Sequence, residues 1–419
     1  MADEPTRRTY LKRTGALVAA GLVAGCSGDS GGTATEGAGA SDSASAEPTD
    51  TVTGETDGTD DGTESSASAY TVSMSPVGDV EFDGVPENVF TVFPQYADMA
   101  VALGHGDALN SVYVPEMSGT TMNHYYERLD GVSFEWEGLY DPLNGGLNKE
   151  KLFELGSDVH LTDPAWASTQ DNWDGSDVEE IRSQVAPWFG NFYSGTHTDA
   201  PDGYGNYQYY TLWELFGKVA GVFQETERYE ALSAVHDDLL STIRSNLPPK
   251  EERPTAVRAT YSAENETFWT YHLNRPGYWL ADTRPLAAND AFGSEQWNGL
   301  WGTVDFETLA EADPDVILHL WGMTPNYKMS EVRAALEDHP IGGQLTAVQN
   351  GNVYPAGMRY QGPIMNLFQL EMGAKQLYPE QFGEWPEYED GEPYPEIPEG
   401  ERLFDRTAVA DAVNGDLQS

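Results

Sequence analysis

A repeated helix–strand segment constrains the fold of this chain more than any other feature of its sequence. Residues 147–161 match residues 304–318 at a constant offset of 157 positions. The identical pairs are Glu150 and Glu307, Leu152 and Leu309, Glu154 and Glu311, Asp158 and Asp315, Val159 and Val316, and Leu161 and Leu318. Each segment predicts a short helix, a turn containing Asp and a buried strand. A repeat at this spacing indicates duplicated domains, because solenoid units recur every 20–50 residues or so.

Strand and helix signals around the repeat predict an α/β architecture. A β-rich segment at 89–93 precedes a helical segment at 97–103 and a second β-rich segment at 109–114. Strand, helix and strand at this spacing favour a βαβ unit with parallel strands. Further strands or helices are expected in the second half at 255–261, 351–354, 363–377 and 406–413. We therefore expect two α/β lobes.

A long helix is predicted between the two copies of the repeat. Apolar residues keep helical spacing from Leu212 onward, and a helix from about Glu225 to Leu247 ends at the pair Pro248 and Pro249. Its length would be roughly 35 Å, enough to run from one lobe to the other. The expected divisions are an N-terminal lobe at 70–206, a connecting helical segment at 207–250, and a C-terminal lobe at 251–419 that includes an irregular strap at 384–400.

The first 69 residues predict an export signal, a lipid anchor and a tether. Arg7 and Arg8 match the twin-arginine pattern, and the short apolar run after them ends at Cys26, as in a lipobox. Residues 1–26 are therefore expected to be a lipoprotein signal peptide, with Cys26 carrying the lipid. Residues 27–69 are rich in Gly, Ser, Thr and acidic residues and predict a disordered tether.

The chain carries 69 acidic against 22 basic residues, a formal net charge of -47. Such a surface repels nucleic acid and anionic membranes, so neither is an expected partner except through the lipid anchor. An acidic surface that binds cations and adaptation to high salt both explain this charge. The scarcity of Lys and the even spread of acids favour the second explanation.

No motif for catalysis or for a resident metal stands out. The single cysteine excludes an intrachain disulfide and a zinc–thiolate site. No nucleophile elbow or Walker loop occurs, and no two of the eight His residues have zinc-ligand spacing. We expect no catalytic residue, resident metal or cofactor, although a metal site built from scattered His and Asp residues stays open.

From about residue 85 to 380 the sequence resembles the periplasmic binding proteins of the ferric-siderophore, haem and cobalamin importers. The resemblance rests on the segment from Phe93 to Gly104, on the unit from Glu150 to Val159, and on the copy of that unit. It implies two Rossmann-like lobes joined by one long α-helix, with a ligand cleft between the lobes. Together with the signal, the tether and the acidity, the sequence is similar to a haloarchaeal lipoprotein member.

The resemblance implies that loops at the carboxyl ends of the strands line the cleft. Those loops hold Arg258, Arg275 and Arg359 and the aromatic residues Tyr96, Tyr140, Trp166, Trp188, Tyr193, Trp269, Tyr271, Trp279, Trp321 and Tyr360. The residues expected to contact ligand are Tyr96, Tyr140, Trp166, Trp269, Trp321, Arg359 and Tyr360. Aromatic faces and guanidinium groups suit an anionic iron(III) chelate, while cobalamin and haem are alternative ligands.

In this family one acidic residue on each lobe docks on arginines of the permease. Asp98 takes that role in the first lobe by its position, and Asp282 and Asp290 are the candidates in the second. The expected function is capture of the chelate outside the cytoplasmic membrane and delivery to an ABC permease and its ATPase, by a monomer that is not an enzyme. A tethered extracellular hydrolase and a ligand-sensing subunit are the rival functions.

Overall fold

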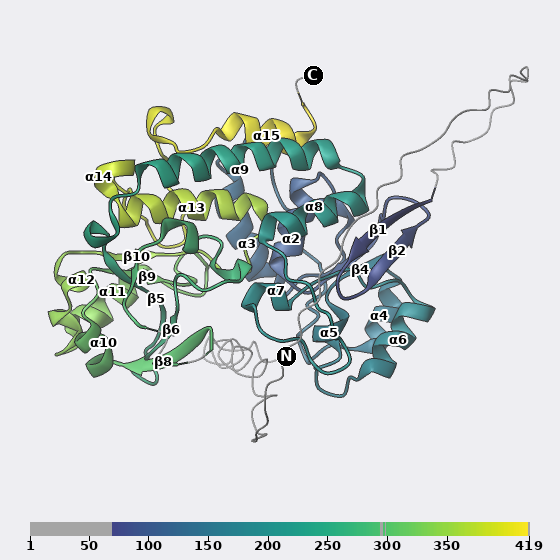
Figure 1. Cartoon of the computed structure of the whole chain (residues 1–419), viewed down its shortest axis with the longest axis horizontal. Coiled ribbons are helices and arrows are strands. Elements are labelled where there is room, and N and C mark those ends of the chain that lie inside the picture. Colours follow the sequence, from purple (N-terminus) through teal and green to yellow (C-terminus); the bar gives the residue numbers. More distant parts are fainter. Residues whose placement is uncertain (1–68, 294–295, 298, 418–419) are drawn as a thin grey trace, which may run out of the picture. The chain divides into compact units, whose positions relative to one another are not determined.

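Two sheets flanked by helices organise the part of the chain that the computed structural model describes, which is residues 69–293, 296–297 and 299–417 (Figure 1). The predictions for Arg7, Arg8 and Cys26, and for the tether up to residue 68, lie outside these residues. Within them, no helix combines the length and the apolar character needed to cross a membrane.

The first lobe is built on the short parallel strands β3 (Val89–Thr91) and β4 (Val159–Leu161), which are buried throughout. Backbone bridges add Leu109 beside Val89 and Trp188 beside His160, so the parallel arrangement continues on both sides. The other elements of this half are β1 (Tyr70–Met74), β2 (Gly78–Phe82), α2 (Pro94–Ala102), α3 (Pro115–Tyr126), α4 (Lys149–Leu155), α5 (Pro164–Ala167), α6 (Gly175–Gln184) and α7 (Tyr193–Thr196).

The segment at 109–114 departs from the prediction of a continuous strand and forms only isolated bridges. The buried Ser111 side chain explains the difference. Its hydroxyl accepts a hydrogen bond from the Thr91 N–H (3.0 Å) and donates one to the Thr91 carbonyl (2.9 Å). A side chain thus takes the place of a backbone ladder at this point, and Pro115 starts helix α3 four residues later.

The second lobe is built on a six-stranded mixed sheet in the order β10-β9-β5-β6-β8, with β7 beside β5. The central strand β5 (Thr255–Ser262) runs parallel to β9 (Val316–His319) and antiparallel to β6 (Thr267–Tyr271). The remaining elements are β7 (Asn289–Asp290), β8 (Trp301–Asp305), α10 (Phe306–Ala312), α11 (Met329–Asp338), α12 (Thr346–Gln349), β10 (Val353–Pro355), α13 (Pro363–Leu377), α14 (Pro379–Phe382) and α15 (Arg406–Asn414).

The repeat seen in the sequence is a repeat of structure. Helices α4 and α10 and the strands that follow them begin at positions that are 157 residues apart, and both helices also end 157 residues apart. Side chains at equivalent positions cap both helices: the Asn148 side chain accepts a hydrogen bond from Lys151 N–H, and that of Asp305 accepts one from Thr308 N–H. The predicted α/β fold with two lobes is confirmed.

Helix α9 (Thr226–Asn246) is the predicted long helix and runs between α15 and α13 in Figure 1. It contacts α8 (Leu212–Phe223) on one side, and α13 and α15 elsewhere. Its buried residues Leu232, Leu239 and Ile243 share one face.

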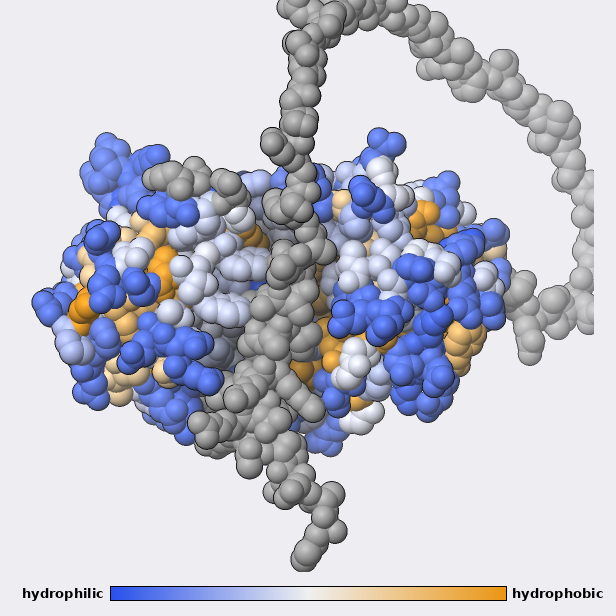
Figure 2. Space-filling view, turned by 90° about the horizontal axis from the view of Figure 1, so that it is seen from below, coloured by the Kyte–Doolittle hydropathy of each residue, from blue (hydrophilic) through white to orange (hydrophobic). Residues whose placement is uncertain are grey.

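The surface of the protein is more hydrophilic than its interior. Hydrophilic residues cover most of the visible face in Figure 2, and hydrophobic residues form small separate patches.

Candidate ligand-binding site

Strand ends from both lobes bring aromatic side chains together. Phe93 follows β3, Trp321 follows β9, and Tyr360 lies five residues after β10. We use the name aromatic cluster for six side chains linked by ring contacts: Phe93, Trp166, Phe192, Trp279, Trp321 and Tyr360. Carboxyl ends of parallel strands are where ligands bind in open α/β sheets, so this cluster is the candidate site.

Rings of the two lobes contact each other directly within the cluster. The Phe93 and Tyr360 ring centroids are 5.4 Å apart, and those of Phe192 and Trp279 are 5.5 Å apart. Such distances are typical of favourable aromatic pairs. A ligand held between the lobes must therefore separate these pairs and replace their contacts with its own.

The Arg359 side chain lies inside the cluster and is only 4% exposed. Its guanidinium carbon is 4.4 Å from the ring centroid of Trp279 and 4.7 Å from that of Tyr360. It donates hydrogen bonds to the hydroxyls of Tyr271 (2.9 Å) and Tyr360 (2.7 Å), while its Nε has no partner among the described residues. Aromatic faces and neutral hydroxyls thus surround this cation.

Arg359 differs from the other deeply buried arginines in having no acidic partner. Arg258 pairs with Asp282 at 3.0 Å, and Arg406 pairs with Glu371. No carboxylate within the described part of the chain lies at ion-pair distance from Arg359. A buried charge without a counter-charge is costly, and an anionic ligand would supply the missing charge.

Trp321 is held in a strained backbone conformation beside the cluster. Its φ of 70° lies in the left-handed region, where a bulky residue is an outlier. Its N–H donates to the Gly357 carbonyl at 2.9 Å, which ties the loop after β9 to the loop that carries Arg359. Strain of this kind costs about 1–3 kcal/mol and concentrates at functional sites.

Asp163 positions two of the aromatic residues of the first lobe. Its carboxylate caps α5, which carries Trp166, by accepting from Ala165 N–H at 2.7 Å. The other oxygen accepts from Phe192 N–H at 2.7 Å and from the Tyr207 hydroxyl. Burial raises the pKa of Asp163 to about 6, and these hydrogen bonds oppose the rise. One carboxyl therefore fixes both the Trp166 helix and the Phe192 loop.

The structure contradicts the docking role predicted for Asp98. Every residue of helix α2 is buried, and the Asp98 carboxyl is fully buried. It accepts hydrogen bonds from the Tyr126 hydroxyl and from Met365 N–H (3.2 Å) at the start of α13. A Cβ at Gly362 would come within 2.4 Å of this carboxyl, so the close approach requires glycine. Burial raises the pKa of Asp98 to about 7. Asp98 thus joins two helices inside the protein.

Asp282 is also unsuited to docking, since it is 4% exposed. It accepts from Arg258 (3.0 Å) and from the Gln361 side-chain amide (2.9 Å), and so supports the loop that follows Arg359. Asp290 is half-buried and lies 3.4 Å from His272. Docking through Asp290 stays a prediction.

Three of the expected ligand contacts lie outside the aromatic cluster. Tyr96 is 1% exposed, and its hydroxyl accepts from Asn191 N–H at 2.7 Å. Tyr140 lies at a sheet edge, its ring 5.3 Å from the Lys151 ammonium. Trp269 lies within β6, which pairs antiparallel with β5, so the rule for parallel strand ends does not apply to it. Trp166, Trp321, Arg359 and Tyr360 do come together.

Phe93, Phe192 and Trp279 belong to the aromatic cluster but are not among the ligand contacts expected from the sequence. A usable signal existed for Phe93, which follows a predicted strand just as Trp321 does. Phe192 gives no such signal, because only Asp163 and the turn before α7 bring it to the cluster.

Metal ligands are not gathered at this site. Within the described residues, no group of three or more His, Cys, Asp or Glu side chains is placed to hold a metal ion. His160 and His319 lie in the sheets, where burial lowers the pKa of each to about 4. The site is therefore built from aromatic rings and one cation.

Comparison with known proteins identifies the class. The family described as periplasmic binding protein matches residues 144–360, more than half of the chain. A solved periplasmic binding protein from Veillonella parvula is 14% identical, with 74% of this chain and 97% of that chain covered and a TM-score of 0.52. The heme binding protein HmuT is 16% identical, with 75% and 92% covered and a TM-score of 0.51. No curated protein matches by sequence. The chain belongs to the periplasmic binding protein family.

Proposed function

We propose that this protein captures an iron(III) chelate of net negative charge in the aromatic cluster and delivers it to an ABC importer. The observation that carries the proposal is the buried Arg359 cation, which has aromatic neighbours and forms no ion pair with a carboxylate of the described residues. The ligand would be cargo and would undergo no chemical change. Export by the twin-arginine signal and lipidation of Cys26 would hold the monomer on the outer face of the cytoplasmic membrane, beside the permease and its ATPase.

The chemistry of a ferric chelate suits this site. Such ligands are bulky and have broad apolar or aromatic faces, which the six rings would contact from both lobes. A guanidinium pairs with carboxylate or phenolate oxygens through charge-assisted hydrogen bonds. The Nε of Arg359 is a donor ready for such an oxygen.

Binding would require a change in the contacts between the lobes. The Phe93–Tyr360 and Phe192–Trp279 pairs would open to admit the chelate and close against it. Helix α9 packs on α8 and also on the short turn at Arg284–Leu286 in the second lobe. A rigid helix that contacts both lobes would keep this movement small.

A tryptophan-fluorescence titration of residues 70–419 tests the proposal. Ferric hydroxamates, ferric catecholates, cobalamin, haemin and bare Fe³⁺ are added separately, with metal-free chelators as controls. Saturable quenching by a ferric chelate at micromolar or lower concentration supports the proposal and names the chelate class. If only haemin or cobalamin gives saturable quenching, the protein is still a binding protein of this family, but its ligand is that tetrapyrrole and not a ferric chelate. No response to any of them rejects both the siderophore and the tetrapyrrole proposals.

A further inference from the structure

A group of three arginine side chains lies apart from the aromatic cluster. It surrounds a cavity of about 310 Å³. The charged residues that line the cavity are Glu127, Arg128, Asp130, Glu396, Arg402 and Arg406. Three arginines at one cavity are unusual in a chain with 22 basic and 69 acidic residues. They come from the end of α3, from the segment after the strap, and from the start of α15.

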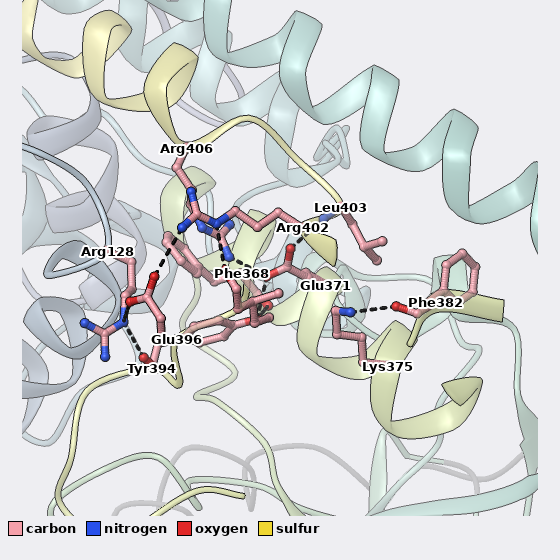
Figure 3. A network of polar contacts seen from close by, with 11 residues as sticks. Arg128, Phe368, Glu371, Lys375, Phe382, Tyr394, Glu396, Arg402, Leu403 and Arg406 are labelled. Carbon is pink, nitrogen blue, oxygen red and sulfur yellow. Dashed lines mark hydrogen bonds and ion pairs between the residues drawn. The ribbon is translucent and has the colours of Figure 1, made fainter. Parts of the chain in front are cut away.

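Arg406 is the buried member of this group, with an exposed fraction of 6%. Its guanidinium carbon lies 3.8 Å from the Phe404 ring centroid and 4.1 Å from that of Phe368. One nitrogen, Nη2, donates to Glu371, as Figure 3 shows, while Nη1 is buried without a partner among the described residues. An unused donor on a buried cation is a costly feature that a bound acceptor would relieve.

Arg128 and Arg402 are each anchored through Nε to a backbone carbonyl. The Nε of Arg128 donates to the Tyr394 carbonyl at 2.5 Å, and the Nε of Arg402 donates to the Ile397 carbonyl at 2.9 Å. Glu396 then bridges them, at 3.2 Å from Arg402 and 3.8 Å from Arg128 (Figure 3).

The Glu396 side chain is held only weakly between Arg128 and Arg402. Its side chain is 69% exposed, and exposed ion pairs contribute little stability because water and salt screen them. Phosphate, or a di- or tricarboxylate from solution, offers the same kind of oxygen acceptors with more charge. Such a ligand could therefore displace the Glu396 side chain at low cost.

We propose that this cavity binds a small multivalent oxyanion, either inorganic phosphate or a di- or tricarboxylate such as citrate. The Glu396 carboxylate occupies the place of the anion until it is displaced. Guanidinium forks match the oxygen spacing of both ligand types, and the cavity volume lies at the lower limit of small-molecule sites. Glu127 and Asp130, which also line the cavity, disfavour weakly held monovalent anions, because only several simultaneous guanidinium contacts overcome their repulsion.

Isothermal titration calorimetry of the purified full chain tests this proposal. Phosphate and citrate are titrated at constant ionic strength, with chloride as the control anion. Saturable binding of either one at millimolar concentration or below is expected, and the stronger of the two identifies the ligand type. Arg128→Gln and Arg402→Gln should each weaken binding about tenfold or more, the loss of one charge-assisted contact. Glu396→Gln should strengthen it severalfold, because the competing carboxylate is gone.

Matched controls separate binding from folding. Arg182→Gln removes an exposed arginine whose ion pair within the described part of the chain is with Glu179 of its own helix, and it should leave affinity unchanged. Thermal unfolding without added anion should be similar for Arg128→Gln, Arg402→Gln and the unaltered protein. Heats that do not exceed those of chloride overturn the proposal. Equal weakening by Arg182→Gln, or an unchanged affinity in both cavity variants, also overturns it.

Discussion

Asp158 and Asp315 make the same contact in the two lobes. The Asp158 carboxylate accepts from Glu87 N–H (2.9 Å) and Asn88 N–H (2.8 Å) just before β3, and that of Asp315 accepts from Thr255 N–H (2.8 Å) at the start of β5. In each lobe the aspartate N–H donates back to the neighbouring backbone, at 2.7 Å to Asn88 and at 2.8 Å to Thr255. The two residues thus fix the register of equivalent strand pairs.

Asp158→Ala and Asp315→Ala should therefore destabilise the protein by similar amounts. Each removes charge-assisted hydrogen bonds to backbone N–H groups, and the expected loss is about 1–2 kcal/mol in the free energy of unfolding. Urea denaturation followed by circular dichroism measures it. Asp171→Ala, at an exposed turn, is the control and should have little effect. If only one of the two substitutions lowers the free energy of unfolding, the equivalent contacts do not stabilise the two lobes equally.

The equivalence of the two repeat units was predictable because it depends on local signals. Helix start, turn and strand are set within about fifteen residues, so matched sequence gives matched structure. Helix α13 is likewise found at the predicted residues Pro363–Leu377. The burial of Asp98 was not predictable in this way. It results from the packing of α2 against α13, whose residue Met365 lies 267 positions after Asp98 in the chain.

The candidate site was predictable only in part, for a related reason. Trp321 and Tyr360 follow parallel strands, so the position of a strand end places them. Trp279 comes instead from a short turn after Gly277, whose φ of 118° favours glycine. No strand pattern in the sequence predicts where such a turn will lie. That no carboxylate of the described residues pairs with Arg359 likewise depends on the positions of side chains from distant parts of the chain, which the sequence does not give.

Arg359→Gln should separate ligand affinity from stability. The variant loses the cation proposed to pair with the ferric chelate, and affinity should fall by roughly 2–5 kcal/mol, equivalent to about thirtyfold or more. Stability should stay the same or rise, because an uncompensated buried charge is removed. Fluorescence titration and thermal unfolding measure the two effects. Arg182→Gln is the control for a general loss of charge. A fully retained chelate affinity would remove Arg359 from the site.

Asp98 should make the protein less stable as pH rises. Burial raises the pKa of Asp98 from 3.8 to about 7, so the folded state holds this proton to a higher pH than the unfolded chain. The free energy of unfolding should therefore fall as pH rises from about 4 to 7, by an amount on the order of a few kcal/mol.

The Asp98→Asn variant isolates this contribution from that of other titrating groups. Asn keeps a carbonyl acceptor for Met365 N–H or the Tyr126 hydroxyl and has no proton to lose near pH 7. The stability of the variant relative to the unaltered protein should rise between pH 4 and 7 in urea denaturation at each pH. A difference that stays constant with pH would mean that Asp98 does not titrate in this range.

Tryptophan substitutions should locate the ligand within the described structure. Trp279 and Trp321 contact Tyr360 in the aromatic cluster, at 5.3 and 5.8 Å between ring centroids, whereas Trp269 lies in β6 outside it. If a chelate binds among these rings, it quenches the nearest indoles most strongly. Trp279→Phe and Trp321→Phe should therefore each remove a large part of the fluorescence change on binding, and Trp269→Phe should leave it nearly intact. Phe keeps an aromatic face, so affinity should fall by less than about tenfold in each case. If the fluorescence change is lost only in Trp269→Phe, the ligand binds beside β6 and outside the aromatic cluster. Arg359 would then not be part of the binding site.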